Sequence, residues 1–119
     1  MTTTGNTSEI RNPIAQVLAW FDPRVVGVSV GVSGTDELRA RISWGDDHAD
    51  DPVMRRAWTM IEATWLILDA GDGLPIAEAW WFGTNPHLAD RSPALVLARD
   101  GHVGAEAVME AAREFALNG

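Results

Sequence analysis

The chain has 119 residues, of which 46% are hydrophobic, and it contains six Trp and three Phe but no Cys. This length and composition predict one compact domain with a substantial core, and the lack of Cys excludes disulfides and thiolate metal sites. The net charge is −8 and every basic residue is Arg, which is unlike the basic surface of a typical nucleic-acid-binding protein.

The charge is unevenly distributed. Residues 1–45 hold four Arg against four acidic residues, whereas residues 46–119 hold five Arg against thirteen acidic residues. An acidic second part suits a basic protein partner, and plain solvation is the alternative. We expect a loose arm over residues 1–10. Because no apolar run approaches the roughly 20 residues of a membrane span, we expect a cytoplasmic protein without membrane contact.

Small polar residues followed by Pro predict where helices begin. Such a residue caps the free N–H groups of a first turn, and Pro is well suited to the first helical position. Four of these pairs precede an apolar run and predict helices, whereas Asn85-Pro86 predicts a turn. The four pairs are Asn12-Pro13, Asp22-Pro23, Asp51-Pro52 and Ser92-Pro93.

The stretch RVVGVSVGVSG, residues 24–34, has two interpretations. Its Val residues alternate as in a strand, and a hairpin with residues 38–44 is one alternative. The other alternative is a helix that begins after Asp22-Pro23 and ends at Gly34, with Thr35 capping the next helix. The local pattern favours neither.

Further helices are predicted along the rest of the chain. The longest covers Val53–Leu68, and another starts at Pro75 and includes Trp80 and Trp81. A short helix capped by Ser92 is expected to close at Gly101. The segment 105–117 predicts an amphipathic helix with Val108, Ala111, Ala112 and Phe115 toward the core and Glu106, Glu110 and Glu114 outside. The predicted fold class is therefore a small all-α bundle.

No set of residues predicts catalysis. His48, His87 and His102 lie far apart and in no ligand spacing. Asp46, Asp47, His48 and Asp50 resemble a cation site, but we interpret them as a charged linker before a helix. We therefore expect no enzyme activity, no metal and no cofactor. A small enzyme of another type is the alternative, and loss of activity on mutating a histidine would support it.

The residues around Ser33-Gly34-Thr35 have the proportions of a helix-turn-helix. In that interpretation Thr35, Arg39 and Arg41 face DNA, because Arg binds guanine edges or phosphate. The alternative is that the two Arg residues only solvate a helix.

The segment AEAWWFGTNPHLADRSPALVLARDGH resembles the toxin-binding domain of the Xre/MbcA/ParS family of antitoxins. The features shared with that family are a helix ending in Trp and Phe, an Asn-Pro-x-Leu turn and a Ser-Pro helix start. They are followed by a closing helix, and the resemblance covers about residues 52–117. Residues 21–44 are similar to the degenerate helix-turn-helix that precedes this domain in many members. The resemblance favours the interpretation of residues 24–34 as a helix.

The resemblance implies a division into an arm (1–10), a helix-turn-helix-like region (11–48) and a toxin-binding domain (49–119). It also implies an antitoxin that inhibits a RES-type toxin acting on NAD⁺, represses its own operon and forms a homodimer or a toxin–antitoxin hetero-oligomer. The alternative is a DNA-binding regulator whose C-terminal domain only dimerises. Adjacent Trp80 and Trp81 cannot both face inward, so we expect at least one near a surface or an interface. The expected toxin-contact residues are Trp81, Asn85, Glu106, Glu110, Arg113, Glu114 and Phe115.

Overall fold

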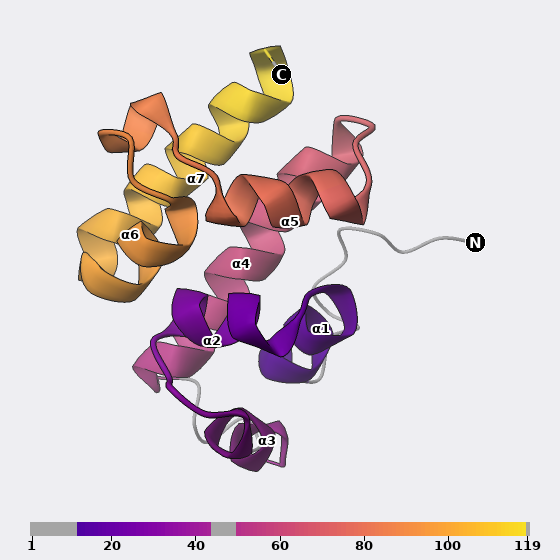
Figure 1. Ribbon diagram of the computed structural model, residues 1–119, viewed down its shortest axis with the longest axis vertical. Coiled ribbons are helices and arrows are strands. Elements are labelled where there is room, and N and C mark those ends of the chain that lie inside the picture. The colour runs from indigo at the N-terminus through magenta and orange to yellow at the C-terminus, as the bar shows by residue number, and fades with distance from the viewer. Residues whose placement is uncertain (1–11, 44–49, 119) are drawn as a thin grey trace.

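The structure is a computed structural model that describes residues 12–43 and 50–118. In these two ranges the chain forms helices joined by short loops, with an isolated bridge between Asn85 and Arg91 and no strand. The expectations for residues 1–10, for Asp46, Asp47 and His48, and for the far end of a hairpin at residue 44 lie outside the described residues. The all-α prediction is confirmed (Figure 1). The elements are α1 (Pro13–Trp20), α2 (Pro23–Val30), α3 (Thr35–Ile42), α4 (Pro52–Asp69), α5 (Leu74–Phe82), the 3₁₀ turn η3 (Pro86–Leu88), α6 (Pro93–Arg99) and α7 (Gly101–Asn118).

The polar residues before Pro cap the helices as predicted. Asn12 accepts a hydrogen bond from the Ala15 N–H at 3.0 Å. Asp22, Asp51 and Ser92 make the equivalent bonds at the starts of α2, α4 and α6. These side chains satisfy N–H groups that have no partner within the helix. The sequence pattern therefore predicted the starts of these four helices to within a residue.

Residues 23–42 form two helices, so the hairpin alternative is wrong. The end of α2 also differs from the prediction, since the helix ends at Gly31, with φ at 83°, and not at Gly34. Its N–H donates to the Gly27 carbonyl at 2.9 Å, which closes the last turn in the left-handed conformation that glycine adopts at low cost. Gly34 is instead the N-cap of α3, and Thr35 is its first residue and makes no side-chain cap.

The corner between α6 and α7 also differs from the prediction. Gly101 begins α7 instead of closing α6, and α7 starts four residues before the predicted Ala105. The two helices meet closely at Gly104, where an added Cβ would lie 2.5 Å from the Val96 carbonyl oxygen. The missing side chain of Gly104 permits this approach, and the sequence pattern alone does not reveal it.

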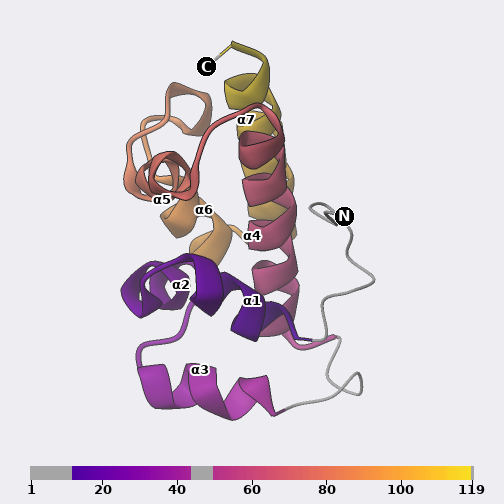
Figure 2. The ribbon, with the colours of Figure 1, turned by 90° about the vertical axis from the view of Figure 1, so that its right-hand side faces the viewer.

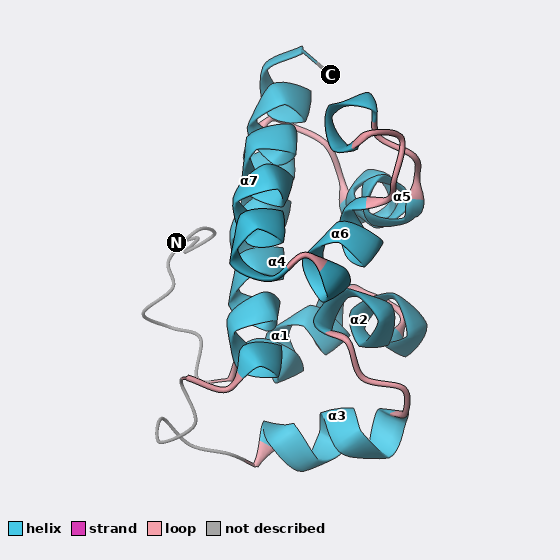
Figure 3. Cartoon of the chain, turned by 90° about the vertical axis from the view of Figure 1, so that its left-hand side faces the viewer, coloured by secondary structure: helices cyan, strands magenta, loops and turns pink. Residues whose placement is uncertain are grey.

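The long helices α4 and α7 run side by side along one side of the molecule, with α5 and α6 on the other (Figures 2 and 3). Helices α1 and α2 pack on α4, and α3 lies beyond them at one end. Helix α6 lies between α2 and α7, and α5 crosses beside the upper part of α4 (Figure 1). Among the described residues, no helix is both long and apolar enough to cross a membrane.

The buried side chains form one cluster that includes members from every α-helix. Its fully buried large members include Ile14 on α1, Val30 on α2, Ile61 on α4, Trp81 on α5 and Leu97 on α6. The core therefore extends across the predicted boundary between residues 48 and 49. The division into two regions stays a prediction.

Candidate functional site

A groove of about 550 Å³ lies between α5, the loop that follows it and the C-terminal half of α7. Its walls are mostly apolar, with polar groups along one edge. Pockets of this volume and character are typical of binding sites. The lining residues are Ile76, Ala79, Trp80, Gly83, Thr84, Asn85, Pro86, His87, Ala111, Glu114, Phe115 and Asn118.

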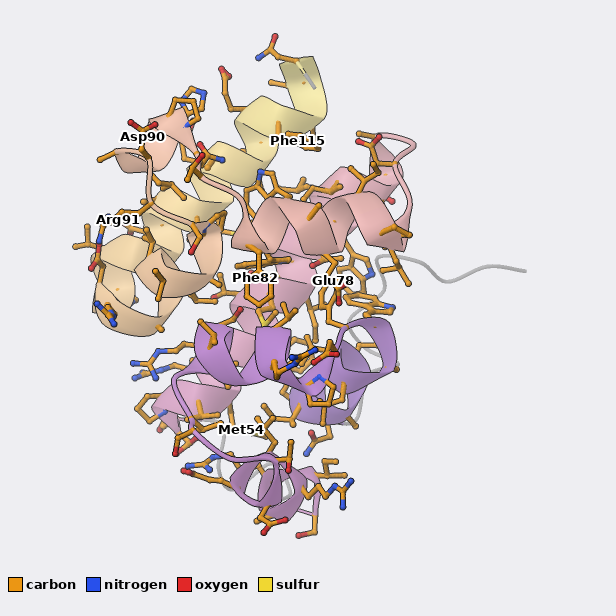
Figure 4. The ribbon with its side chains drawn as sticks, viewed as in Figure 1. Met54, Glu78, Phe82, Asp90, Arg91 and Phe115 are labelled. Carbon is orange, nitrogen blue, oxygen red and sulfur yellow. The ribbon has the colours of Figure 1, made fainter. Side chains whose placement is uncertain are left out.

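Three of the predicted toxin-contact residues line this groove. Asn85 comes from the loop, and Glu114 and Phe115 come from α7. Figure 4 shows Phe115 on the side of α7 that faces α5, and its ring centroid lies 6.4 Å from that of Trp80. Residues 30 positions apart in sequence therefore meet at one surface feature.

Asn85 holds the groove's loop in shape. Its Oδ1 accepts from the His87 N–H at 2.9 Å, and its carbonyl accepts from the Leu88 and Asp90 N–H groups. The side chain is 8% exposed. Asn85 is thus a turn-forming residue at the groove's edge, as the Asn-Pro turn predicted.

An ion pair fixes the other end of the same loop. Arg91 contacts Asp100 at 2.7 Å, which joins the loop to the α6–α7 corner. The hydrogen bond from Arg91 lowers the pKa of the Asp100 carboxyl below its ordinary value. Figure 4 shows Asp90 and Arg91 at the outer side of this loop.

Trp81 does not lie at a surface. It is 0% exposed, and its Nε1–H donates to the Thr64 hydroxyl at 3.1 Å inside the core. The expected toxin contact through Trp81 is therefore not available in this structure. The expectation that the two adjacent Trp residues cannot both face inward is wrong, since both are buried. A buried acceptor lets Trp81 bury its whole indole.

Trp80 lines the groove in its place. It is 8% exposed, and its Nε1–H is buried and has no acceptor among the described residues. A buried donor without an acceptor is uncommon in folded proteins.

The other predicted contact residues of α7 lie outside the groove. Glu106, Glu110 and Arg113 are exposed, and Arg113 pairs with Glu110 at 3.2 Å. Glu114 lies at the groove and is half-buried. The last turn of α7 exposes Leu117 by 82%, so acidic and apolar groups adjoin at this end of the molecule.

The predicted DNA contacts on α3 do not form a basic surface. Thr35 and Arg39 are exposed, but the Arg41 side chain is 13% exposed and pairs with Glu37 at 2.9 Å and Asp51 at 3.3 Å. Arg41 therefore links α3 to the start of α4. Two acidic residues in the first turn further offset the two Arg residues of this helix.

Ile76 and Trp80 are groove residues that the sequence analysis did not assign. Helix α5 is apolar nearly all round. This pattern predicts burial but does not show which side of the helix stays exposed.

No side-chain group with metal-ligand geometry occurs among the described residues. The fold and this groove define a small all-helical protein with a mostly apolar surface groove. Comparison of the chain with models of protein families, with curated proteins and with solved structures finds no match.

Proposed function

We propose that the chain is an antitoxin, which binds and inhibits a RES-type toxin that consumes NAD⁺ or transfers ADP-ribose from it. The observation that carries this proposal is the C-terminal end of α7. There Glu114 and Phe115 line a groove, and Leu117 is 82% exposed one turn of helix or less away. The region over which the chain resembles the antitoxin family, about residues 52–117, supplies all of the groove's lining residues except Asn118.

Charge supports this choice of partner. A cleft that binds an anionic dinucleotide is expected to be rich in Arg or Lys. Glu106 and Glu110 on the exposed side of α7, together with Glu114, offer the opposite charge. Leu117 supplies an apolar group that can anchor the contact. The inhibitor acts where NAD⁺ is turned over, so we place the complex in the cytoplasm.

Operator binding is not part of this proposal. Of the three residues expected to contact DNA, Arg41 is held by Glu37 and Asp51. The described part of α3 carries as many acidic as basic side chains, and DNA binding depends on net positive charge at the contact.

The test is co-expression with a RES-type protein, taken from the neighbouring reading frame if that frame encodes one. We expect the pair to co-purify and the chain to suppress the partner's NAD⁺ loss. A chain that stops after Phe115 should inhibit at least about tenfold less well, because Leu117 is lost while the buried face of α7 is kept. The Val103→Asp variant serves as a control, since Val103 is 73% exposed near the other end of α7. Full inhibition by the shortened chain would contradict the proposed role of this end.

A further inference from the structure

We propose that the groove between α5 and α7 receives an amphipathic helical segment of the partner protein, with a Lys or Arg placed against Glu114. This inference rests on the proposed function, and it names the chemistry of the partner's contact. Grooves between helices commonly bind the apolar face of an added helix.

The apolar character of α5 supports a polypeptide occupant. The helix exposes Pro75, Ile76, Ala79 and Phe82 on its outer side, with Ile76 at 47% and Phe82 at 50%. Figure 4 shows Phe82 on the side of α5 toward α2. A helix that is apolar all round is normally covered on every side. Within residues 12–43 and 50–118, nothing covers the exposed part of Ile76 at the groove.

Glu114 supplies the charge that selects a basic occupant. Its Oε1 accepts from the Asn118 amide at 3.0 Å, which holds the carboxylate at the groove's edge. No Arg within the described ranges pairs with Glu114, since the neighbouring Arg113 pairs with Glu110. The groove lining holds no Arg. A cation beside apolar residues on one helix face therefore complements this edge.

Trp80 lines the same groove and carries a polar group that lacks a hydrogen-bond partner. Its buried Nε1–H finds no acceptor among the described residues, and an unsatisfied buried donor is costly. A polar side chain on the bound segment can supply the acceptor after a small shift of the ring. The groove therefore complements a bound segment that carries large apolar side chains, one cationic side chain and one hydrogen-bond acceptor.

A second copy of the chain is a poorer occupant. Each copy carries a net charge of −8, so two copies that meet at an acidic edge repel one another. Several of the chain's own cations are also already in ion pairs, namely Arg24, Arg41, Arg91 and Arg113. The charge balance therefore favours a different, basic protein.

The experiment measures affinity for the purified toxin by calorimetry with paired variants. Ile76→Asp should weaken binding by at least about tenfold, whereas the exposed control Val103→Asp should change it little. Glu114→Gln should weaken binding about two- to fivefold, and the exposed Glu62→Gln should not. Circular dichroism should show the same helix content in all four variants, because each side chain is at least partly exposed.

A photo-crosslinking residue at position 76 identifies the occupant directly. We expect it to capture a toxin segment with apolar residues at three- and four-residue spacing and a Lys or Arg among them. Crosslinking to a second copy, or to an acidic segment, would overturn the inference. If the wild-type chain binds toxin and Ile76→Asp binds equally well, the groove assignment is wrong and the proposed function stands. If the wild-type chain binds no toxin, the proposed function fails, and the groove assignment fails with it.

Discussion

Thr64 is a buried hydroxyl on α4, whose other inward side chains are apolar. It is 0% exposed and accepts the indole N–H of Trp81 at 3.1 Å. Helix positions of this kind usually favour an aliphatic residue, so the hydroxyl indicates a specific partner. At the residue scale this contact decides that Trp81 is a core residue and that its neighbour Trp80 faces the groove.

Replacing Thr64 with Val should lower the free energy of unfolding by about 1–3 kcal/mol. The two side chains have nearly the same shape, so the main change is an indole N–H left without an acceptor. Urea denaturation followed by fluorescence gives the value. Thr64→Ser keeps the hydroxyl and loses one methyl group, about 0.8 kcal/mol. A Val variant as stable as the wild type would show that the hydrogen bond contributes nothing.

At the scale of elements, α3 is attached to the rest of the fold by polar contacts at its C-terminal end. The Asn12 amide nitrogen donates to the Arg41 carbonyl at 2.9 Å and to the Ile42 carbonyl at 3.1 Å. The same side chain caps α1 through its oxygen. Leu38 is the buried residue of α3. With so little buried surface, α3 depends on Asn12 and on the Arg41 ion pairs for its position.

The Asn12→Asp variant separates the two roles of this side chain, which are to cap α1 and to donate to the carbonyl groups at the end of α3. The carboxylate keeps an acceptor for the Ala15 N–H but places negative charge against two carbonyl oxygens. We expect the free energy of opening of the α3 amides to fall by about 1 kcal/mol or more, with α1 less affected. Amide hydrogen exchange measures both helices in one experiment, and Asn12→Ala, which loses both roles, should destabilise α1 as well. Unchanged exchange in α3 would contradict this account.

The Arg91–Asp100 pair predicts a dependence on pH. Because the bond to Arg91 lowers the pKa of Asp100, the ionised carboxylate is favoured in the folded state. Its contribution is present above the ordinary carboxyl pKa and is lost as pH falls through the lowered value. Arg91→Gln should therefore shift the urea midpoint downward at pH 7 but hardly at pH 2. Arg99→Gln removes an exposed Arg that forms no ion pair within the described residues, and it should show no such difference between the two pH values.

At the scale of the molecule, α4 joins the N-terminal and C-terminal parts of the fold. It packs against α1 and α2, which precede it in the chain, and against α5 and α7, which follow it. Helix α2 also packs against α6, across the predicted boundary at residues 48 and 49. The buried side chains form one cluster, and a chain with one shared core is expected to unfold as one unit.

We therefore expect a single unfolding transition for the full chain. Far-ultraviolet circular dichroism and Trp fluorescence should give the same urea midpoint, because Trp residues lie in both predicted regions. The slope should be about 1–2 kcal/mol/M for a chain of this size. Two separated midpoints would show that residues 11–48 and 49–119 fold independently, as the predicted division allows.

Helix starts were predictable because they depend on neighbouring residues. Asn12, Asp22, Asp51 and Ser92 each cap within two or three residues of their own position, so the signal is contained in the local sequence. The ends were less predictable. Gly31 and Gly34 both satisfy the local rule for a helix end. Helix α2 ends at Gly31, next to the Val30 carbonyl, which accepts from the Arg56 guanidinium of α4 at 3.0 Å.

The groove was only partly predictable. Asn85, Glu114 and Phe115 were each expected among the toxin contacts, and the structure brings them to one groove. The choice between Trp80 and Trp81 was not predictable, because it depends on a hydroxyl 17 positions away. The pairing of Arg41 with Asp51 likewise joins residues from different helices.

The sequence by itself determined the helical class, the helix starts, the acidic character and the outward face of α7. These properties follow from local capping, from periodicity and from composition. The tertiary structure decided where α2 ends, which Trp faces the groove, and that Arg41 serves the fold in place of an exposed contact. These three outcomes depend on distant residues meeting in space, and the energies of such contacts are not contained in any short stretch of the chain.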